Sequence, residues 1–359
     1  MKKQSSTIHP TAERGTHGSL SRRHVLAGGT AIGLSTLWPI GRARAAQALT
    51  LRLDWTTSGL HAPFYVAMDR GWFKKYGVDL KMDDGNGSSG TVQLVGSRQY
   101  DVGFAAIAPM AVARAKGLSV ISIAGFLRKG DTGIIVPAEK HWTKPSDLAN
   151  KKVGYTANSL EGPFVTSFFA RNGVPESQLQ LVNTDLSTKM TVYLSGQVDA
   201  MISTVPGYLP SVTDKRPSSG ILFADFGLNL PGYGLLVNQS TLKAKRETLS
   251  RFASIICGAW TYVLAGHQDE AAKIILAKRP DTIYSLPVMV QQILAFKPFF
   301  YTEATKNLPI GVQAASDWKG TIQGMEAAKV IPAGSKPADY FTNDLIDRDL
   351  VAKLATGVA

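Results

Sequence analysis

The stretch 51–82 constrains the fold of this chain more than any other part of its sequence. Alternating apolar and polar residues over 49–53 predict a strand, which ends at Asp54. A polar turn follows, and Pro63 then suits the first turn of a helix, because its missing N–H needs no partner there. Gly77 can adopt the left-handed conformation that ends a helix, and a second strand begins after it. This order predicts the βαβ unit of a parallel sheet.

Three side chains close to the end of the first strand are candidate ligand contacts. In an open α/β sheet, a ligand lies beyond the carboxyl ends of the strands. Trp55, His61 and Tyr65 are therefore predicted to line a cleft. We expect Trp55 and Tyr65 to stack on a ligand ring, and His61 to donate or accept at its edge. The alternative for His61 is a structural role in the core.

Two short segments of small residues could bring backbone groups close to a ligand. Ser88 or Ser89 is expected to cap the helix after a Gly-rich turn, with free N–H groups facing the cleft. The turn lacks the lysine and the spacing of a P-loop, so it can equally be an ordinary capped loop. Ala105, Ala106 and Ile107 follow the next strand and either approach the ligand or simply pack.

The second half of the chain repeats this arrangement. A strand over 152–155 leads into a polar segment that holds Asn158 and Glu161 before another helix. Asn158 is a candidate polar contact. Glu161 could accept from an amine or a ring amino group and would repel an anionic ligand, or it could be a solvated residue at a helix start. Tyr208 could stack on a ring or pack in the core, and Tyr233 lies where the chain is expected to return to the first half.

Several of these phrases resemble one known family. Asp54-Trp55, the spacing His61-x-x-x-Tyr65-Val-Ala and the run Gly71-Trp-Phe-Lys-Lys-Tyr-Gly-Val-Asp-Leu are similar to the thiamine-precursor-synthase-like family of periplasmic substrate-binding proteins. The resemblance covers about 49–300 and includes 144–154, where Asn150 replaces the usual Gly but tolerates the same left-handed cap.

The resemblance implies an α/β chain with the type II periplasmic-binding-protein fold, in which two Rossmann-like lobes are joined by a two-strand hinge. Lobe 1 would comprise 49–136 and 236–359, and lobe 2 would comprise 137–235. A length of 359 residues also favours two domains. Closure about the hinge would bury the ligand.

The family resemblance implies the solute-binding component of an ABC importer, with a permease in the inner membrane as partner. The expected ligand is a small heteroaromatic compound, either a pyrimidine precursor of thiamine or a riboflavin-like molecule. The alternative is a binder of an aliphatic sulfonate, taurine or an aromatic acid, which a cleft lined by Arg or Lys would favour. Arg128 and Lys129 are the strand-end cations that could serve such a site. We expect no cofactor and no metal, and a monomer.

A third alternative is an enzyme. Related synthases in this superfamily use a substrate-like His together with a cysteine cluster associated with iron. His61 could match that His, but Cys257 is the only cysteine and cannot supply a cluster or a disulfide. Cys257 lies in a predicted helix over 251–265 and is expected to pack there.

The N-terminal segment 1–46 has the features of a signal peptide. It carries seven basic residues and one acidic residue, which is half of the formal net charge of +12. Ser21-Arg22-Arg23-His24-Val25-Leu26 resembles the twin-arginine export motif, and the apolar run 25–40 is too short for a stable span of the bilayer. Export to the periplasm is predicted, with a membrane anchor or a disordered tail as the alternative. The remaining charge forms no basic run, so nucleic acid is not an expected partner.

Overall fold

The computed structural model describes residues 46–157, 159, 161–185 and 187–358. The chain divides into residues 1–43 and 44–359, and all the described residues lie in the second of these units. The predicted signal peptide, including its twin-arginine motif, therefore lies outside the described residues except for Ala46. Asn158, a candidate ligand contact, also lies outside them.

The first sheet has five strands in the order β2-β1-β3-β10-β4. β1 is parallel to both β2 and β3, whereas β10 is antiparallel to β3 and β4. The strands are β1 (Gln47–Arg52), β2 (Val78–Asp83), β3 (Val102–Ala106), β4 (Val120–Gly125) and β10 (Tyr233–Asn238). The predicted βαβ unit is confirmed, with β1 and β2 as its strands.

The second sheet has the same pattern, in the order β7-β6-β8-β5-β9. β6 is parallel to β7 and β8, and β5 is antiparallel to β8 and β9. The strands are β5 (Thr132–Pro137), β6 (Lys152–Tyr155), β7 (Gln180–Asn183), β8 (Ala200–Thr204) and β9 (Ser218–Leu222). Each sheet therefore receives one antiparallel strand that is entered directly from the other sheet.

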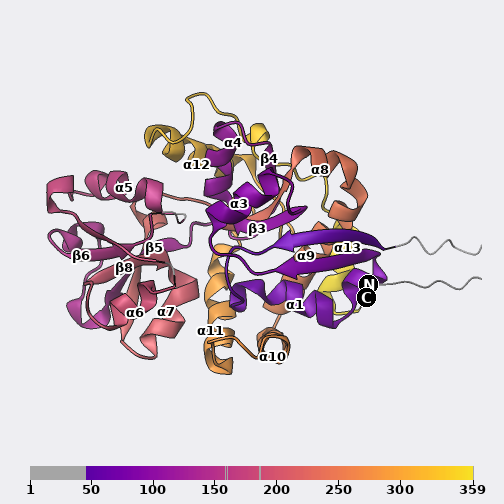
Figure 1. Ribbon diagram of the computed structural model, residues 1–359, viewed down its shortest axis with the longest axis horizontal. Coiled ribbons are helices and arrows are strands. Elements are labelled where there is room, and N and C mark those ends of the chain that lie inside the picture. Colours follow the sequence, from indigo (N-terminus) through magenta and orange to yellow (C-terminus); the bar gives the residue numbers. More distant parts are fainter. Residues whose placement is uncertain (1–45, 158, 160, 186, 359) are drawn as a thin grey trace, which may run out of the picture. The chain divides into compact units, whose positions relative to one another are not determined.

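Helices cover both sheets, and Figure 1 shows α5 on one side of β6 and β8, with α6 and α7 on the other. They are α1 (Ala62–Asp69), α2 (Trp72–Lys75), α3 (Ser88–Gly96), α4 (Ile107–Ala115), α5 (Val165–Arg171), α6 (Lys189–Leu194), α7 (Val205–Thr213), α8 (Gln239–Ala244), α9 (Arg246–Leu264), α10 (Gln268–Lys278), α11 (Leu286–Phe296), α12 (Ala315–Ala327) and α13 (Arg348–Ala355).

The backbone has the left-handed conformation at the predicted helix ends. Gly77 has φ of 68° after α2, and Asn150 has φ of 62° before β6. Gly71 has φ of 67° and separates α1 from α2. Asn tolerates this region because its short polar side chain can hydrogen-bond locally.

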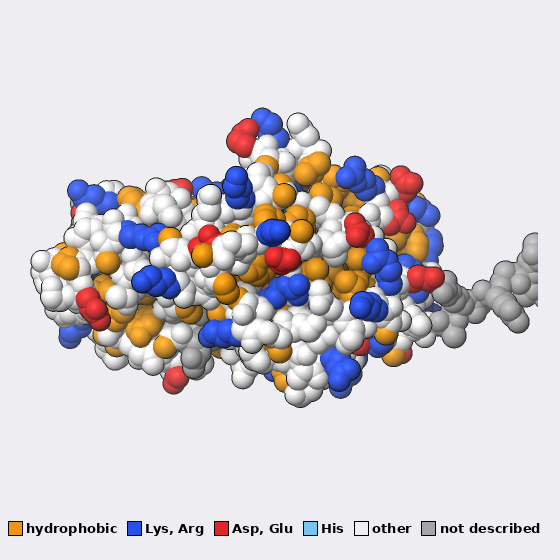
Figure 2. Space-filling model, turned by 90° about the horizontal axis from the view of Figure 1, so that it is seen from above, with side chains coloured by type: hydrophobic (Ala, Val, Ile, Leu, Met, Phe, Trp, Pro, Cys, Tyr) orange, Lys and Arg blue, Asp and Glu red, His pale blue; other side chains and the backbone are white. Residues whose placement is uncertain are grey.

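Helix α9 contributes many buried residues to the larger core. Cys257 and Trp260 on this helix are fully buried, which confirms the predicted packing role of Cys257. Within the described residues, no single helix is long and apolar enough to cross a membrane. Helices α9 and α10 meet the criteria of length and composition only as a pair, and the chain bends by 120° between them. Figure 2 shows Lys and Arg side chains scattered over the visible face, among acidic side chains, with no single basic patch.

Two neighbouring segments connect the sheets, one between β4 and β5 and the other between β9 and β10. They are hydrogen-bonded to each other: Gly232 N–H donates to the Leu127 carbonyl at 2.8 Å, and Gly130 N–H donates to Asn229 Oδ1 at 2.7 Å. Strand pairing places these crossings a few residues before the predicted boundaries at 136 and 235, because β5 already pairs with β8 from Thr132 onward. The division into two lobes that close on each other stays a prediction.

Candidate functional site

The loop after β1 is held in place by its own backbone and by the loop before α3. Thr91 Oγ1 donates to the Leu53 carbonyl at 2.7 Å, and Gly87 N–H donates to the Asp54 carbonyl at 2.6 Å. Gly85 is needed in this contact, because a Cβ there would lie 2.1 Å from the Leu53 carbonyl oxygen. The backbone of Asp54 is thereby fixed at the end of the strand, where the sequence placed a ligand site.

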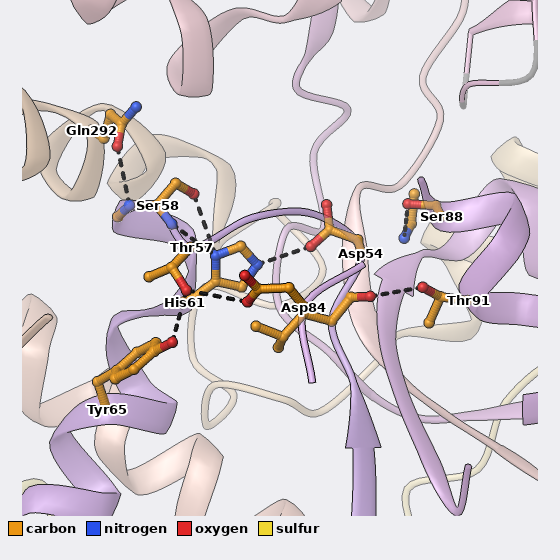
Figure 3. Close-up of polar contacts among 12 residues, drawn as sticks. Asp54, Thr57, Ser58, His61, Tyr65, Asp84, Ser88, Thr91 and Gln292 are labelled. Carbon is orange, nitrogen blue, oxygen red and sulfur yellow. Dashed lines mark hydrogen bonds and ion pairs between the residues drawn. The ribbon is translucent and has the colours of Figure 1, made fainter. Parts of the chain in front are cut away.

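Both ring nitrogens of His61 are already engaged. Ser58 N–H donates to Nδ1 at 3.0 Å, so Nδ1 is the acceptor and Nε2 carries the proton that it donates to Asp54 Oδ1 at 2.9 Å (Figure 3). The His61 side chain is 1% exposed. Both ring nitrogens thus have protein partners, which favours the alternative of a structural role: His61 is a neutral imidazole that orients the carboxylate of Asp54. Its contact with a ligand ring stays a prediction.

Asp54 and His61 belong to a cavity with a volume of about 80 Å³. Its walls come from the segments after β1, β2, β6, β7 and β8, from the start of β10, and from the region around α11. The lining residues are Asp54, Trp55, Ser58, Leu60, His61, Gly87, Ser88, Ser159, Glu161, Lys189, Ser203, Thr204, Gly207, Tyr208, Tyr233, Tyr284 and Phe296. Residues that follow strands of both sheets thus face one space.

A buried ion pair forms part of this wall. Lys189 Nζ lies 3.0 Å from Glu161 Oε1, and the two side chains are only 1% and 5% exposed. Glu161 is therefore not a solvated residue at a helix start, because the ammonium group of Lys189 pairs with it. Lys189 also lies 5.9 Å from the centre of the Tyr208 ring. Lys189 was not predicted to line a site, since a lysine at the start of a short helix normally reaches solvent.

The cavity is rich in aromatic rings: Trp55, Tyr208, Tyr233, Tyr284 and Phe296 all line it. Burial raises the pKa of Tyr208 and Tyr233, and nearby acidic groups add to both shifts, so both hydroxyls are neutral at physiological pH. Tyr284 and Phe296 were not predicted, because they lie far along the chain in a helical region with no family phrase. The sequence around Tyr284 and Phe296 is apolar, so no local pattern distinguishes these two residues from core residues.

The predicted site residues divide into two groups. Trp55, His61, Ser88, Glu161, Tyr208 and Tyr233 line the cavity. Three others, Tyr65, Ser89 and Ala106, do not line it. The roles of the lining residues in binding a ligand stay predictions.

The reasons for the three misplacements are local. The Tyr65 hydroxyl is hydrogen-bonded to Thr57 Oγ1 at 2.7 Å, so Tyr65 supports the loop after β1 from the side away from the cavity. Ser89 faces a separate hollow on the side of α4. Ala106 is buried at the end of β3, where its N–H donates to Ser88 Oγ at 3.1 Å. Ser88 is also not the expected N-cap of α3, because the helix begins at Ser88 itself and Gly87 occupies the N-cap position.

An arginine from the distant C-terminal half supports the same loop. Arg279 bonds the carboxylate of Asp84 through both terminal nitrogens, at 2.8 and 2.7 Å. It also donates to Thr57 Oγ1 at 2.6 Å and to the Tyr65 hydroxyl at 3.1 Å. Hydrogen bonds to Asp84 and Asp281 raise the pKa of Arg279, so it stays charged. Arg279 acts behind the cavity wall and does not line it.

Asp131 is a buried acid at the crossing between the sheets. Its side chain is fully buried, and neither carboxyl oxygen has a hydrogen-bond partner among the described residues. Burial raises the pKa of Asp131 to about 7, and the carboxylates of Asp54 and Glu161 add to that shift. Asp131 therefore keeps its proton to a much higher pH than an exposed aspartate does. No group of three or more His, Cys, Asp or Glu side chains within the described part of the chain could hold a metal ion.

Comparison with known proteins gives three kinds of similarity. A family model described as NMT1/THI5 like matches residues 59–271, more than half of the chain. The formylaminopyrimidine-binding protein of Halalkalibacterium halodurans is 23% identical over 294 residues, 79% of this chain and 86% of that protein. The 4-amino-5-hydroxymethyl-2-methylpyrimidine phosphate synthase of Aspergillus parasiticus is 31% identical over 239 residues, 62% of this chain and 68% of that protein.

Among solved structures, the alkanesulfonate-binding protein SsuA of Xanthomonas axonopodis pv. citri, bound to MOPS, matches with a TM-score of 0.63. The match covers 84% of this chain and 99% of that one, at 15% identity. At this identity the likeness shows the fold alone. It confirms the predicted α/β architecture of the periplasmic-binding-protein class.

Proposed function

The chain belongs to the NMT1/THI5-like family, and on this premise we propose that it is the solute-binding component of an ABC importer that captures a single-ring aminopyrimidine. The name of the 23% identical relative, a formylaminopyrimidine-binding protein, supports this ligand class. The synthase relatives support the same chemistry, since the name of their product contains an aminopyrimidine ring. The cavity of this chain supplies the independent argument.

The charge of the cavity is the observation that carries the proposal. Two carboxylates line it, Asp54 and Glu161, and Lys189 is the one cation among the described lining residues. Lys189 is already paired with Glu161, and His61 is neutral, so the walls carry a net charge of about −1 from Asp54. A sulfonate or nitrate would meet a carboxylate with no unpaired cation to offset it. An amino group or a protonated ring nitrogen would find an acceptor.

The size of the cavity separates a pyrimidine from a riboflavin-like ligand. The cavity volume of about 80 Å³ is below the ~150 Å³ in which an engineered apolar cavity holds benzene. Even one six-membered ring requires the cavity to widen, and a three-ring flavin would require it to widen far more. We assign the stacking surfaces to Trp55 and Tyr208, which follow strands of different sheets.

The proposal is for a binder and not an enzyme. Cys257, the only cysteine, is fully buried in α9 and is absent from the residues that line the cavity. His61 uses both ring nitrogens to hold the loop and Asp54. The aromatic rings and the carboxylates around the cavity support a role in stacking on a ring and accepting its hydrogen bonds.

We also propose that the chain acts in the periplasm, with an inner-membrane permease as its partner, and that it is exported by the twin-arginine route. The motif Ser21–Leu26 in the sequence supports the export route. Cell fractionation tests it: replacement of Arg22 and Arg23 by Lys is expected to leave the chain in the cytoplasm. Periplasmic recovery of that variant would contradict the route without affecting the ligand proposal.

Calorimetric titration of the protein without its first 46 residues tests the ligand class. We expect 4-amino-5-hydroxymethyl-2-methylpyrimidine to bind, and riboflavin, taurine and nitrate to give no heat. Asp54→Asn should weaken binding by about 10- to 100-fold, because a hydrogen bond to a charged group contributes ~1.5–3 kcal/mol. The Asn oxygen can still accept from His61, so the loop is kept.

The matched control is Asp79→Asn, which removes an exposed carboxylate from β2, away from the cavity. It should bind like the wild-type protein. Binding of taurine or nitrate in place of the pyrimidine would contradict the proposed ligand class, and so would unchanged pyrimidine affinity in Asp54→Asn.

A further inference from the structure

Gln292 connects two walls of the cavity through one side chain. It lies on α11 and is fully buried. Its Oε1 accepts from Gly59 N–H at 3.0 Å, and its Nε2 donates to the Gly207 carbonyl at 2.8 Å. Figure 3 shows the first of these bonds beside His61 and Ser58. A single carboxamide therefore satisfies a backbone donor and a backbone acceptor from two distant segments.

The two segments belong to different sheets. Gly59 begins the short helix Gly59–His61, which follows β1 of the first sheet. Gly207 lies in the first turn of α7, which follows β8 of the second sheet. Both segments line the cavity, the first through Trp55 and His61 and the second through Gly207 and Tyr208. The separation of the two walls is thus fixed at the position of Gln292.

The contact with the first wall has no spare room. A Cβ at Gly59 would lie 2.8 Å from Gln292 Cβ and 3.0 Å from both the Ile293 nitrogen and the Met289 oxygen. Helix α11 therefore touches the backbone of the loop that carries Trp55 and His61. On the second side, Ser211 Oγ lies 3.5 Å from Gln292 Nε2, which keeps the carboxamide among polar groups.

We propose that Gln292 is a positioning residue of the ligand cavity: its carboxamide holds the loop after β1 and the start of α7 at the separation that lets both contact one ligand. The proposal rests on the proposed function, because it explains how an aminopyrimidine meets residues from both sheets at once. The side chain must both donate and accept. Glutamine does so at every pH, whereas glutamate does so only when it is protonated.

The pH dependence of glutamate at this position distinguishes the proposed hydrogen-bonding role from a general packing role. In Gln292→Glu, the ionised carboxylate cannot donate to the Gly207 carbonyl and faces its oxygen across a buried contact. The protonated acid can again donate to Gly207 and accept from Gly59. We expect the Kd for 4-amino-5-hydroxymethyl-2-methylpyrimidine at pH 8 to rise on the order of tenfold or more relative to wild type. At pH 5 it should return to within about threefold.

The neighbouring residue provides the matched control. Gln291 is exposed on the outer side of the same helix, so Gln291→Glu introduces the same charge one position away. It should bind like the wild-type protein at both pH values. Thermal unfolding of each variant at each pH, without ligand, reports whether the fold is retained. If Gln292→Glu is unfolded at pH 8, Gln292→Met is measured instead, and it should show the weaker affinity at pH 5 and pH 8 alike.

The outcomes separate this proposal from the ligand proposal. Failure of the wild-type protein to bind the pyrimidine contradicts the proposed function before any variant is compared. If the wild-type protein binds, a Gln292→Glu affinity equal to wild type at pH 8 overturns the positioning role. A loss of affinity in Gln292→Glu that is the same at pH 5 and pH 8 also overturns the positioning role. Full affinity in Gln292→Met would overturn it too.

Discussion

Replacing Asp131 by Asn should change how the stability of this protein depends on pH. Asp131 is fully buried at the crossing between the sheets, and its carboxyl oxygens have no partner among the described residues. Burial raises its pKa from 3.8 to about 7. The folded state therefore holds a proton that the unfolded state releases between these two values, so the free energy of unfolding decreases as pH rises through this window.

The size of the effect follows from the shift. One pKa unit corresponds to about 1.4 kcal/mol, so the shift of Asp131 from 3.8 to about 7 costs the folded state about 4 kcal/mol once the pH is above 7. Between pH 5 and pH 8 the loss is about 3 kcal/mol, because part of the shift lies below pH 5. Asn has the shape of the neutral acid and cannot ionise, so Asp131→Asn avoids this loss.

Urea unfolding at pH 5 and pH 8 measures this difference. The variant and the wild-type protein should be of similar stability at pH 5, and the variant should be more stable by about 3 kcal/mol at pH 8. Other titrating groups are common to both proteins and cancel in the comparison. Asp79→Asn, at an exposed position on β2, should show no such dependence. A stability difference between Asp131→Asn and wild type that is equal at the two pH values would refute the assignment of a buried, protonated Asp131.

Three further predictions concern other buried groups. Glu161→Gln should lower the free energy of unfolding by about 3–5 kcal/mol, because Lys189 is left buried without its carboxylate; adding Lys189→Met should recover most of that loss in urea unfolding, and no recovery would argue against the ion pair as the cause. Arg279→Met removes the support of Asp84 and should weaken pyrimidine binding by calorimetry, with unchanged affinity as the contrary result. The thiol of Cys257, whose pKa burial raises to about 12, should react with a thiol reagent at pH 8 only after unfolding, and rapid labelling of the folded protein would contradict its burial.

The regular elements followed from local patterns. Alternation over 49–53 predicted β1, and helical spacing over 251–265 predicted the core of α9, which extends from Arg246 to Leu264. Positive φ at Gly77 and Asn150 was predictable because few residues tolerate that conformation. These features depend on residues a few positions apart, and such signals are contained in the sequence itself.

The site was predicted in part, and the errors have a common cause. Trp55 and Glu161 were recognised because they follow predicted strand ends, where ligands of α/β proteins lie. The hydrogen bonds of His61 were not predictable, since the backbone N–H of Ser58 reaches its ring only in the short helix that the loop forms. Lys189 was missed because its burial depends on a partner 28 residues away.

The sequence by itself determined the order of strands and helices, the class of fold and the strand ends at which a ligand would lie. Only the tertiary structure decided which polar groups there already have partners and which remain to face a ligand. Gln292 illustrates the difference: it contacts Gly59, 233 residues earlier in the chain, and Gly207, 85 residues earlier. No local pattern encodes such a bond, because it forms only when α11 packs against segments that follow strands of both sheets.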